Sequence, residues 1–155
     1  MENPLDRALI ERIERCYQKL SGALLPCPDA TPDRVKWLHE DAPYSLLAHG
    51  NAPDPFFIYA NRCALRCFRY TREEFLRLPS RLSAASPDRQ KRQRMLERLT
   101  TEGIVFGYSG LRITRLGESF NIYDGIVWQL TDDDGVSWGQ GALFWLSPRT
   151  TGHVI

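Results

Sequence analysis

The stretch from residue 104 to residue 146 constrains the fold more than any other part of the chain. Turn signals at 116–118 and 132–135 divide it into three segments that are rich in β-branched and aromatic residues. The apolar positions that share one parity are Phe120, Ile122, Ile126, Trp128 and Leu130 in the second segment, and Val136, Trp138, Ala142, Phe144 and Leu146 in the third. Such alternation places side chains on one side of a pleated sheet. The stretch therefore predicts an antiparallel meander with one apolar face, which we expect to line the core and any ligand pocket.

Composition narrows the class of protein. The chain has 155 residues, of which 43% are hydrophobic and 25% charged, as is typical of one globular domain with helical additions. Its formal net charge of +1 gives no argument for a nucleic acid or a membrane as partner. No apolar run approaches the roughly 20 residues that span a bilayer. The charged N-terminus lacks the apolar region of a signal peptide, so we expect a cytoplasmic protein.

The cysteines and histidines form no pattern that binds a metal. None of the four cysteines belongs to a Cys-x-x-Cys pair, and we expect small buried side chains in a reducing compartment. Cys63 and Cys67 are four residues apart on a predicted helix, so they can share one face of it. Gly-rich phosphate loops and nucleophile motifs are also missing from the sequence, which favours a protein without catalysis.

The N-terminal segment predicts an amphipathic helix over 4–21. Asn3 is the expected N-cap, and Pro4 takes the first helical position. The apolar stripe consists of Leu5, Leu9, Ile13, Cys16, Tyr17, Leu20 and Leu24. This stripe has to be buried either on the sheet of the same domain or on a second copy of the chain, and the sequence leaves both open. The second arrangement predicts a homodimer through residues 4–21.

The middle of the chain supplies the remaining elements. A short helix ending near Glu40 precedes strands at 44–49 and 56–60, and a further helix follows Asn61. Thr71-x-x-Glu74 is a capping box, and a longer helix is expected over 87–102. Two strands, a helical crossover and three meander strands make an α+β domain in the element order of a PAS domain. We expect a five-stranded antiparallel sheet with helices across one face, an N-terminal helical extension over 1–40, the PAS-like domain over 41–147 and a C-terminal tail over 148–155.

Two long runs of sequence resemble a known family. They are DPFFIYANRCALRCFRYTREEFLRLPSRLSA at 54–84 and EGIVFGYSGLRITRLGESFNIYDGIVWQLTDDDGVSWGQGALF at 102–144. Together they are similar to the MEKHLA domain, a PAS-related family found in stand-alone bacterial proteins and at the C-terminus of plant class III homeodomain-zipper proteins. Gln129 and Gly141 depart mildly from the family pattern. The resemblance implies a sensory or regulatory role and brings no established chemistry with it.

Polar residues at apolar positions are the first candidates for a ligand site, because burying them unpaired costs roughly 1–3 kcal/mol. Gln140 shares its parity with Trp138 and should point inward, either to a structural hydrogen bond or to a ligand. Arg112 lies inward or outward depending on whether a bulge at Gly107 and Gly110 shifts the strand register. If Arg112 points inward, it needs an acidic partner, for which Asp124 is available, or an anionic ligand.

Five further residues complete the predicted ligand-binding set. Arg81, in the connector that covers the cavity of PAS domains, either receives a carboxylate or phosphate or ties the connector to the sheet. Tyr108 and Trp128 are aromatic residues of the pocket or of the core. Tyr59 and Asn61 stand where the second strand meets the first helix of the PAS-like segment.

The cofactor remains unknown from sequence, although two classes are disfavoured. A photoactive flavin domain needs an Asn-Cys-Arg-Phe-type motif in the mid-domain helix, whereas Asn61-Arg62-Cys63 has another order and place. Residues 72–103 contain no histidine for a haem. The basic residues over 87–102 are interleaved with acids and are expected to form a solvated helix face. The sequence predicts a non-catalytic sensory module that binds a small molecule between sheet and helices, with a ligand-free dimerisation module as the alternative.

Overall fold

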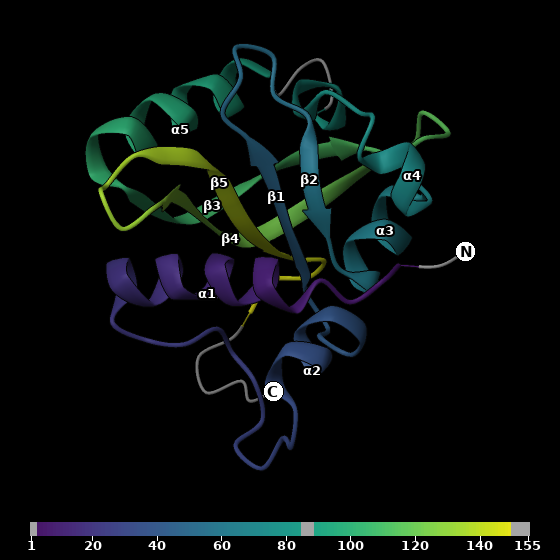
Figure 1. The fold of residues 1–155 in the computed structure, drawn as a ribbon. Coiled ribbons are helices and arrows are strands. Elements are labelled where there is room, and N and C mark those ends of the chain that lie inside the picture. The colour runs from purple at the N-terminus through teal and green to yellow at the C-terminus, as the bar shows by residue number, and fades with distance from the viewer. Residues whose placement is uncertain (1–2, 85–88, 150–155) are drawn as a thin grey trace.

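The computed structural model describes residues 3–84 and 89–149 and has a five-stranded antiparallel sheet at its centre (Figure 1). The strands are β1 (Ser45–Gly50), β2 (Phe57–Ala60), β3 (Ile104–Ile113), β4 (Ser119–Thr131) and β5 (Ser137–Trp145). They lie in the order β2-β1-β5-β4-β3. The predicted meander and the predicted position of the first two strands at one side of it are therefore confirmed.

Helices follow the predicted order along the chain. They are α1 (Arg7–Ser21), α2 (Arg34–Glu40), α3 (Arg62–Phe68), α4 (Arg72–Phe75), the 3-10 helix η1 (Ser80–Ser83) and α5 (Arg89–Glu102). Asn61 caps α3, and the capping box between Thr71 and Glu74 is formed at α4. The predicted start of α5 at 86–88 lies outside the described residues. In Figure 1, α1 crosses the sheet on one side and α5 lies on the other.

The sheet buries both of its faces, so the expectation of a single apolar face is wrong. Trp128, Leu130 and Leu143 belong to a core cluster with α1 and α2. Val127 and Phe144 belong to a second cluster with α3, α4 and α5. We call the two sides of the sheet the α1 face and the α5 face.

Helices α1 and α2 cover the α1 face, and a bulge in β4 changes which residues of that strand point to it. Between Tyr123 and Ile126 the pairing with β5 shifts, and Asp124 takes a positive φ of 50°. A bulge changes which residues of a strand point to a given face. Residues on either side of it therefore point to opposite faces: Ile122 packs in the cluster of the α5 face, whereas Trp128 packs in that of the α1 face.

Helix α1 begins later than predicted and packs on the sheet of its own chain. Asp6, not Asn3, is the N-cap, and its side chain accepts a hydrogen bond from the backbone N–H of Leu9. Asn3 instead donates to the carbonyl of Ala60, 3.0 Å away, which holds the N-terminal segment against β2. The apolar stripe of α1 packs in the cluster of the α1 face as far as Tyr17, whereas Leu20 and Leu24 are exposed. Of the two arrangements left open by the sequence, the structure has the intramolecular one for this part of the stripe. No helix of the described residues is long and apolar enough to cross a bilayer.

Candidate functional site

A small cavity lies on the α5 face of the sheet. Its volume is about 30 Å³, which is room for about two water molecules. Apolar side chains from the sheet and from α5 form most of its wall, among them Leu47, Val127, Met95 and Phe144. Arg92, Arg112, His49 and Gln140 also reach it. This combination of a mainly apolar wall with a few convergent polar groups is typical of small-molecule sites.

Arg112 is buried on the α5 face and has only 2% of its surface exposed. Its guanidinium donates hydrogen bonds to the backbone carbonyl of Leu111 at 3.1 Å and to the hydroxyl of Tyr108 at 3.2 Å. The same group lies 5.4 Å from the ring centre of Tyr108 and 5.5 Å from that of Phe144, which are cation–π distances. The bulges between Val105 and Gly110 set this inward direction, so the predicted effect of a bulge in β3 is confirmed.

The predicted internal pair between Arg112 and Asp124 is not formed. Asp124 is exposed, and its carboxylate accepts a hydrogen bond from the backbone N–H of Arg149 at 2.6 Å. Its position in the β4 bulge directs it away from the cavity. None of the ion pairs among residues 3–84 and 89–149 includes Arg112.

Arg92 brings a second positive charge to the cavity from α5. It is half-buried and donates a hydrogen bond to the hydroxyl of Ser80, 2.8 Å away. Burial, and then the positive charge of Arg112, lower the pKa of Arg92 to about 10. The guanidinium therefore stays protonated at neutral pH, and the described residues provide no carboxylate that pairs with it.

Gln140 and His49 face each other across neighbouring strands, since the two residues are paired in the ladder of β1 and β5. Gln140 points inward as predicted, and its Oε1 is buried without a hydrogen-bond partner among the described residues. The Nδ1 of His49 contacts the carbonyl of Gly50 at 2.8 Å. Burial lowers the pKa of His49, and the charge of Arg92 contributes in the same direction, so the imidazole is neutral at pH 7.

Trp128 lies on the α1 face and does not line this cavity, contrary to the prediction that it shares the pocket face. Its Nε1–H donates to the backbone carbonyl of Ile13 at 3.2 Å, and its ring meets Tyr17 edge-on at 4.9 Å. Gly141, its partner across the ladder, leaves the space that the indole occupies, because a Cβ there would lie 2.8 Å from the ring. Trp128 therefore anchors α1 to the sheet.

Tyr59 and Asn61 also lie away from the cavity. Tyr59 contacts the Nδ1 of His39 at 2.9 Å, and burial raises the pKa of its phenol. The Asn61 oxygen accepts from the backbone N–H groups of Leu46 and Ala64. Its amide nitrogen donates to two carbonyls, those of Leu38 and Tyr44. Asn61 thus has all its usual hydrogen bonds within the fold.

Arg81 is the last predicted residue that the structure keeps apart from the cavity. It is exposed, and its Nε lies 2.9 Å from the carboxylate of Asp54 in an ion pair that ties η1 to the loop before β2. The connector nevertheless contributes to the cavity wall through Ser83, whose hydroxyl donates to the carbonyl of Ser80 at 2.7 Å. Of the seven predicted ligand-binding residues, Arg112 and Gln140 line the cavity, and Tyr108 contacts Arg112 beside it.

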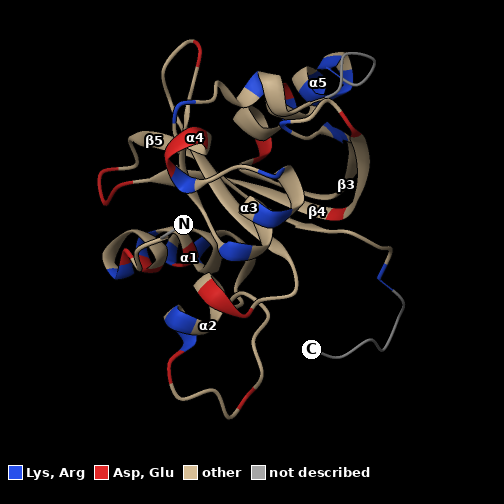
Figure 2. Cartoon of the chain, turned by 90° about the vertical axis from the view of Figure 1, so that its right-hand side faces the viewer, with Lys and Arg blue, Asp and Glu red and all other residues tan. Residues whose placement is uncertain are grey.

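Sequence analysis missed Arg92 and His49 as cavity residues. Arg92 was assigned to a solvated helix face, and the surrounding arginines of α5 are indeed exposed. Figure 2 shows basic residues along this helix, and helical spacing is the signal that distinguishes Arg92 from the others. Arg92 precedes Met95 by three residues and Leu99 by seven, which places it on their face of the helix. For His49 the available signal was its alternation with Leu47 in β1, which places both side chains on the α5 face.

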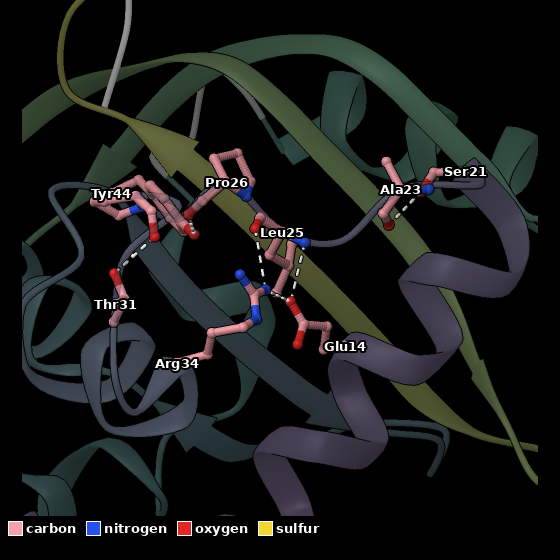
Figure 3. Close-up of polar contacts among 9 residues, drawn as sticks. Glu14, Ser21, Ala23, Leu25, Pro26, Thr31, Arg34 and Tyr44 are labelled. Carbon is pink, nitrogen blue, oxygen red and sulfur yellow. Dashed lines mark hydrogen bonds and ion pairs between the residues drawn. The ribbon is translucent and has the colours of Figure 1, made fainter.

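The α1 face holds a polar cluster of a different kind (Figure 3). Glu14 is 8% exposed, forms an ion pair with Arg34 and accepts a hydrogen bond from the backbone N–H of Leu25 at 3.0 Å. Arg34 also donates to the carbonyl of Leu25 at 3.2 Å, and Tyr44 donates to that of Pro26 at 2.6 Å. These contacts fasten the loop after α1, and both charges have a partner.

The two cysteines of α3 share a face, as their spacing predicts. Their sulfur atoms are 3.8 Å apart, and both approach the hydroxyl of Ser45. The hydrogen bond with Cys67 lowers the pKa of Cys63 to about 7. No group of three or more potential metal ligands occurs among the residues that the structure describes.

Solved structures of PAS and light-oxygen-voltage domains have the same fold. A PAS domain from Colwellia psychrerythraea superimposes with a TM-score of 0.64 at 12% identity, over 74% of this chain and 93% of that one. A light-oxygen-voltage domain studied with a flavin analogue gives 0.60 at 18% identity, over 72% of this chain and 82% of the other. An RNA-binding light-oxygen-voltage receptor gives 0.59 at 17% identity, over 77% of this chain and 35% of that one. The chain thus has a PAS-like α+β fold.

Sequence comparison then identifies the family. The model of the MEKHLA domain matches residues 7–146, which is nearly the whole chain and includes α1. The protein belongs to the MEKHLA domain family, as the motifs predict. None of the curated proteins matches it in sequence.

Proposed function

We propose that this protein is a non-catalytic sensory or regulatory module that binds a small molecule on the α5 face. The observation that carries the proposal is the cavity, where polar groups from β1, β3, β5 and α5 meet. Among the described residues, the buried Oε1 of Gln140 has no hydrogen-bond partner, and Arg92 and Arg112 have no carboxylate partner. Leaving such groups unpaired costs roughly 1–3 kcal/mol each, and a ligand would remove that cost. The PAS-like fold supports the location, between the sheet and its helices.

Helix α5 is suited to transmit the occupancy of the cavity. Only Met95 and Leu99 of α5 are buried, so few apolar contacts hold the helix to the sheet. Arg92 and Met95 both line the cavity, and a ligand would contact the helix directly. If α5 gains contacts only when the ligand is bound, ligand binding shifts its population toward the docked state. A partner protein that binds one of the two states then responds to the ligand.

The cavity is smaller than a typical metabolite, so binding requires its wall to open. Several lining side chains can move because they are long and flexible, in particular Met95, Leu96 and Arg92. The proposal therefore includes an outward movement of α5 side chains on binding. Hydrogen exchange of the α5 amides, measured with and without ligand, tests this step.

The direct test is extraction of the ligand from the purified protein. The wild-type chain and the variant Ala142→Leu are purified identically, denatured and analysed by mass spectrometry for small molecules. Ala142 lines the cavity, so a leucine there fills it, whereas Ala30→Leu adds the same atoms at an exposed position. We expect a molecule that accompanies the wild type and Ala30→Leu but not Ala142→Leu. Absence of any such molecule, with all three proteins folded, would contradict the proposal.

Homodimerisation remains a separate proposal. The stripe of α1 is covered by its own sheet, so a dimer contact through residues 4–21 would have to use the side of the helix that is still exposed. Leu20 and the following Leu24 are 42% and 46% exposed and could contribute. Light scattering on the wild type and on Leu20→Ser tests this, and a wild-type monomer at high concentration would exclude it.

A further inference from the structure

The charges around the cavity are all of one sign. Arg112 is buried and donates, within the described residues, only to a carbonyl and a phenol, neither of which carries a negative charge. Stacking on Tyr108 and Phe144 offsets part of the desolvation cost but leaves the charge in place. Buried charges in proteins are normally paired, and none of the ion pairs among the described residues includes Arg112, so an anionic ligand would suit this guanidinium.

One more cation reaches the cavity, and another lies over the ring of Tyr108. Arg92 reaches the same cavity from α5, and the charge of Arg112 acts on it directly. The ammonium group of Lys91 lies 5.8 Å from the ring centre of Tyr108, the residue that holds Arg112. Like charges repel more strongly where water is excluded, and a neutral or cationic ligand would leave that repulsion unrelieved. An anion between Arg92 and Arg112 would relieve it and join α5 to β3.

Gln140 requires a hydrogen-bond donor from the ligand, in addition to the negative charge that the arginines require. Its buried Oε1 can only accept a hydrogen bond, and it receives none from the described residues. The Gln140 amide lies close enough to His49 to favour the protonated imidazole, but that ring is neutral at pH 7. A ligand that satisfies the whole cavity therefore carries a hydrogen-bond donor as well as a negative charge.

We propose that the ligand is a small organic acid whose oxyanion, a carboxylate or a phosphate, binds between Arg92 and Arg112 and whose hydroxyl or amino group donates to Gln140. Arginine suits this role because its planar guanidinium donates two parallel hydrogen bonds to an oxyanion. The inference rests on the proposed binding function and names its ligand class.

The test compares acids with their neutral amides on the full-length protein. Binding of acetate, lactate and inorganic phosphate is measured by calorimetry in a buffer low in chloride, beside acetamide and lactamide. We expect an acid to bind and its amide not to bind. Lactate should bind more tightly than acetate, and Gln140→Leu should remove that advantage. Phosphate binding in place of carboxylate binding supports the oxyanion site and assigns it to phosphate.

Arginine variants locate the site. Arg112→Met and Arg92→Met should each weaken binding about tenfold or more, because each removes a charge-assisted hydrogen bond. Arg98→Met is the matched control, since Arg98 lies on the same helix but is exposed and paired with Glu102. Arg92 is only half-buried, so its variant remains informative if Arg112→Met folds poorly.

Three results would overturn the inference. They are equal binding of acid and amide, an equal loss in Arg98→Met, and no binding of any acid or phosphate. Its failure can be told apart from failure of the proposed function. If the molecule extracted from the purified protein is neutral, the function stands and the oxyanion is wrong. If nothing is extracted and no probe binds, both are wrong.

Discussion

The two faces of the sheet are both apolar, but their polar groups are in opposite situations. On the α1 face, Glu14 is paired with Arg34, and the indole N–H of Trp128 has an acceptor. On the α5 face, Arg112 has only neutral acceptors among the described residues, and Gln140 Oε1 has no donor. A continuous helix with a buried stripe covers the first face, whereas shorter elements and the weakly held α5 cover the second.

This difference separates stability from function. A chain gains stability by pairing the groups it buries, as it does for Glu14, Arg34 and the Trp128 indole on the α1 face. The exception on that face is the Trp138 Nε1, which has no hydrogen-bond partner among the described residues. Unpaired groups reduce stability and persist where they are needed for something else. The α1 face is therefore the structural side of the domain, and the α5 face is the side on which we propose that a ligand binds. Substitutions on the two faces should therefore have opposite effects.

Trp128→Ala should have the largest effect. The indole is fully buried and fixes α1 through Ile13 and Tyr17, so its removal leaves a cavity and frees the helix. We expect a loss of about 3–5 kcal/mol in the free energy of unfolding, measured by urea denaturation. Binding of any ligand of the α5 face should be unchanged at temperatures where the variant is folded. A loss below about 1 kcal/mol would contradict the structural role of this face.

Glu14→Gln should have the next largest effect on stability. The variant keeps the size of the side chain but leaves Arg34 without its counter-charge and weakens the hydrogen bond from Leu25. We expect a loss of about 1–3 kcal/mol in unfolding free energy. Arg34→Met in the Glu14→Gln background should then cost less than it does alone, which a double-mutant cycle measures. Additive effects of the two substitutions would show that the ion pair between Glu14 and Arg34 contributes nothing to stability.

The sequence allowed prediction of the elements wherever a local pattern determines the structure. The helix after Asn61, the capping box at Thr71 and the meander turns depend on neighbouring residues, and they were predicted correctly. Counting parity failed in β4, because the bulge at Asp124 changes the face of every residue beyond it. The local signal for that bulge is Asp124-Gly125 inside the strand, and parity counted across this pair placed Trp128 on the wrong face.

The site was partly predictable for the same reason. Arg112 and Gln140 interrupt apolar alternation, which is visible in the sequence, and both proved to face the cavity. Arg92 lies among arginines that are exposed, and its helical spacing to Met95 and Leu99 is the sequence signal that places it on the face of α5 toward the sheet. Asn3 was predicted as a helix cap from its neighbours alone. Its actual partner, the carbonyl of Ala60, is 57 residues away, so no local pattern indicates that contact.

Gln140→Leu should stabilise the protein without ligand, by about 1 kcal/mol, because it removes a buried acceptor that has no donor. Its matched control is Gln129→Leu. Gln129 is paired with Gln140 across the ladder, but its Oε1 accepts a hydrogen bond from Ser137 at 3.3 Å. We expect no gain from the control variant, as measured by thermal denaturation. Equal responses of the two variants would show that the gain does not come from the missing hydrogen bond of Gln140.

The pH dependence of stability should give the smallest effect. The pKa of His49 is lowered in the folded protein, so the unfolded chain takes up the proton first as the pH falls. The contribution of His49 is therefore present above about pH 6.5, its ordinary pKa, and is lost as the pH falls from there through the folded pKa. Between pH 7 and pH 5, urea denaturation should show a steeper decline for the wild type than for His49→Asn.

A bound oxyanion should reduce this decline. Part of the lowering comes from the charge of Arg92, and an anion beside that charge would make protonation of His49 easier. Saturating acid should bring the pH profile of the wild type closer to that of His49→Asn. If the profiles of the two proteins coincide without ligand, the imidazole is not held neutral by the α5 face. If they differ but the acid leaves them unchanged, the anion does not bind next to Arg92.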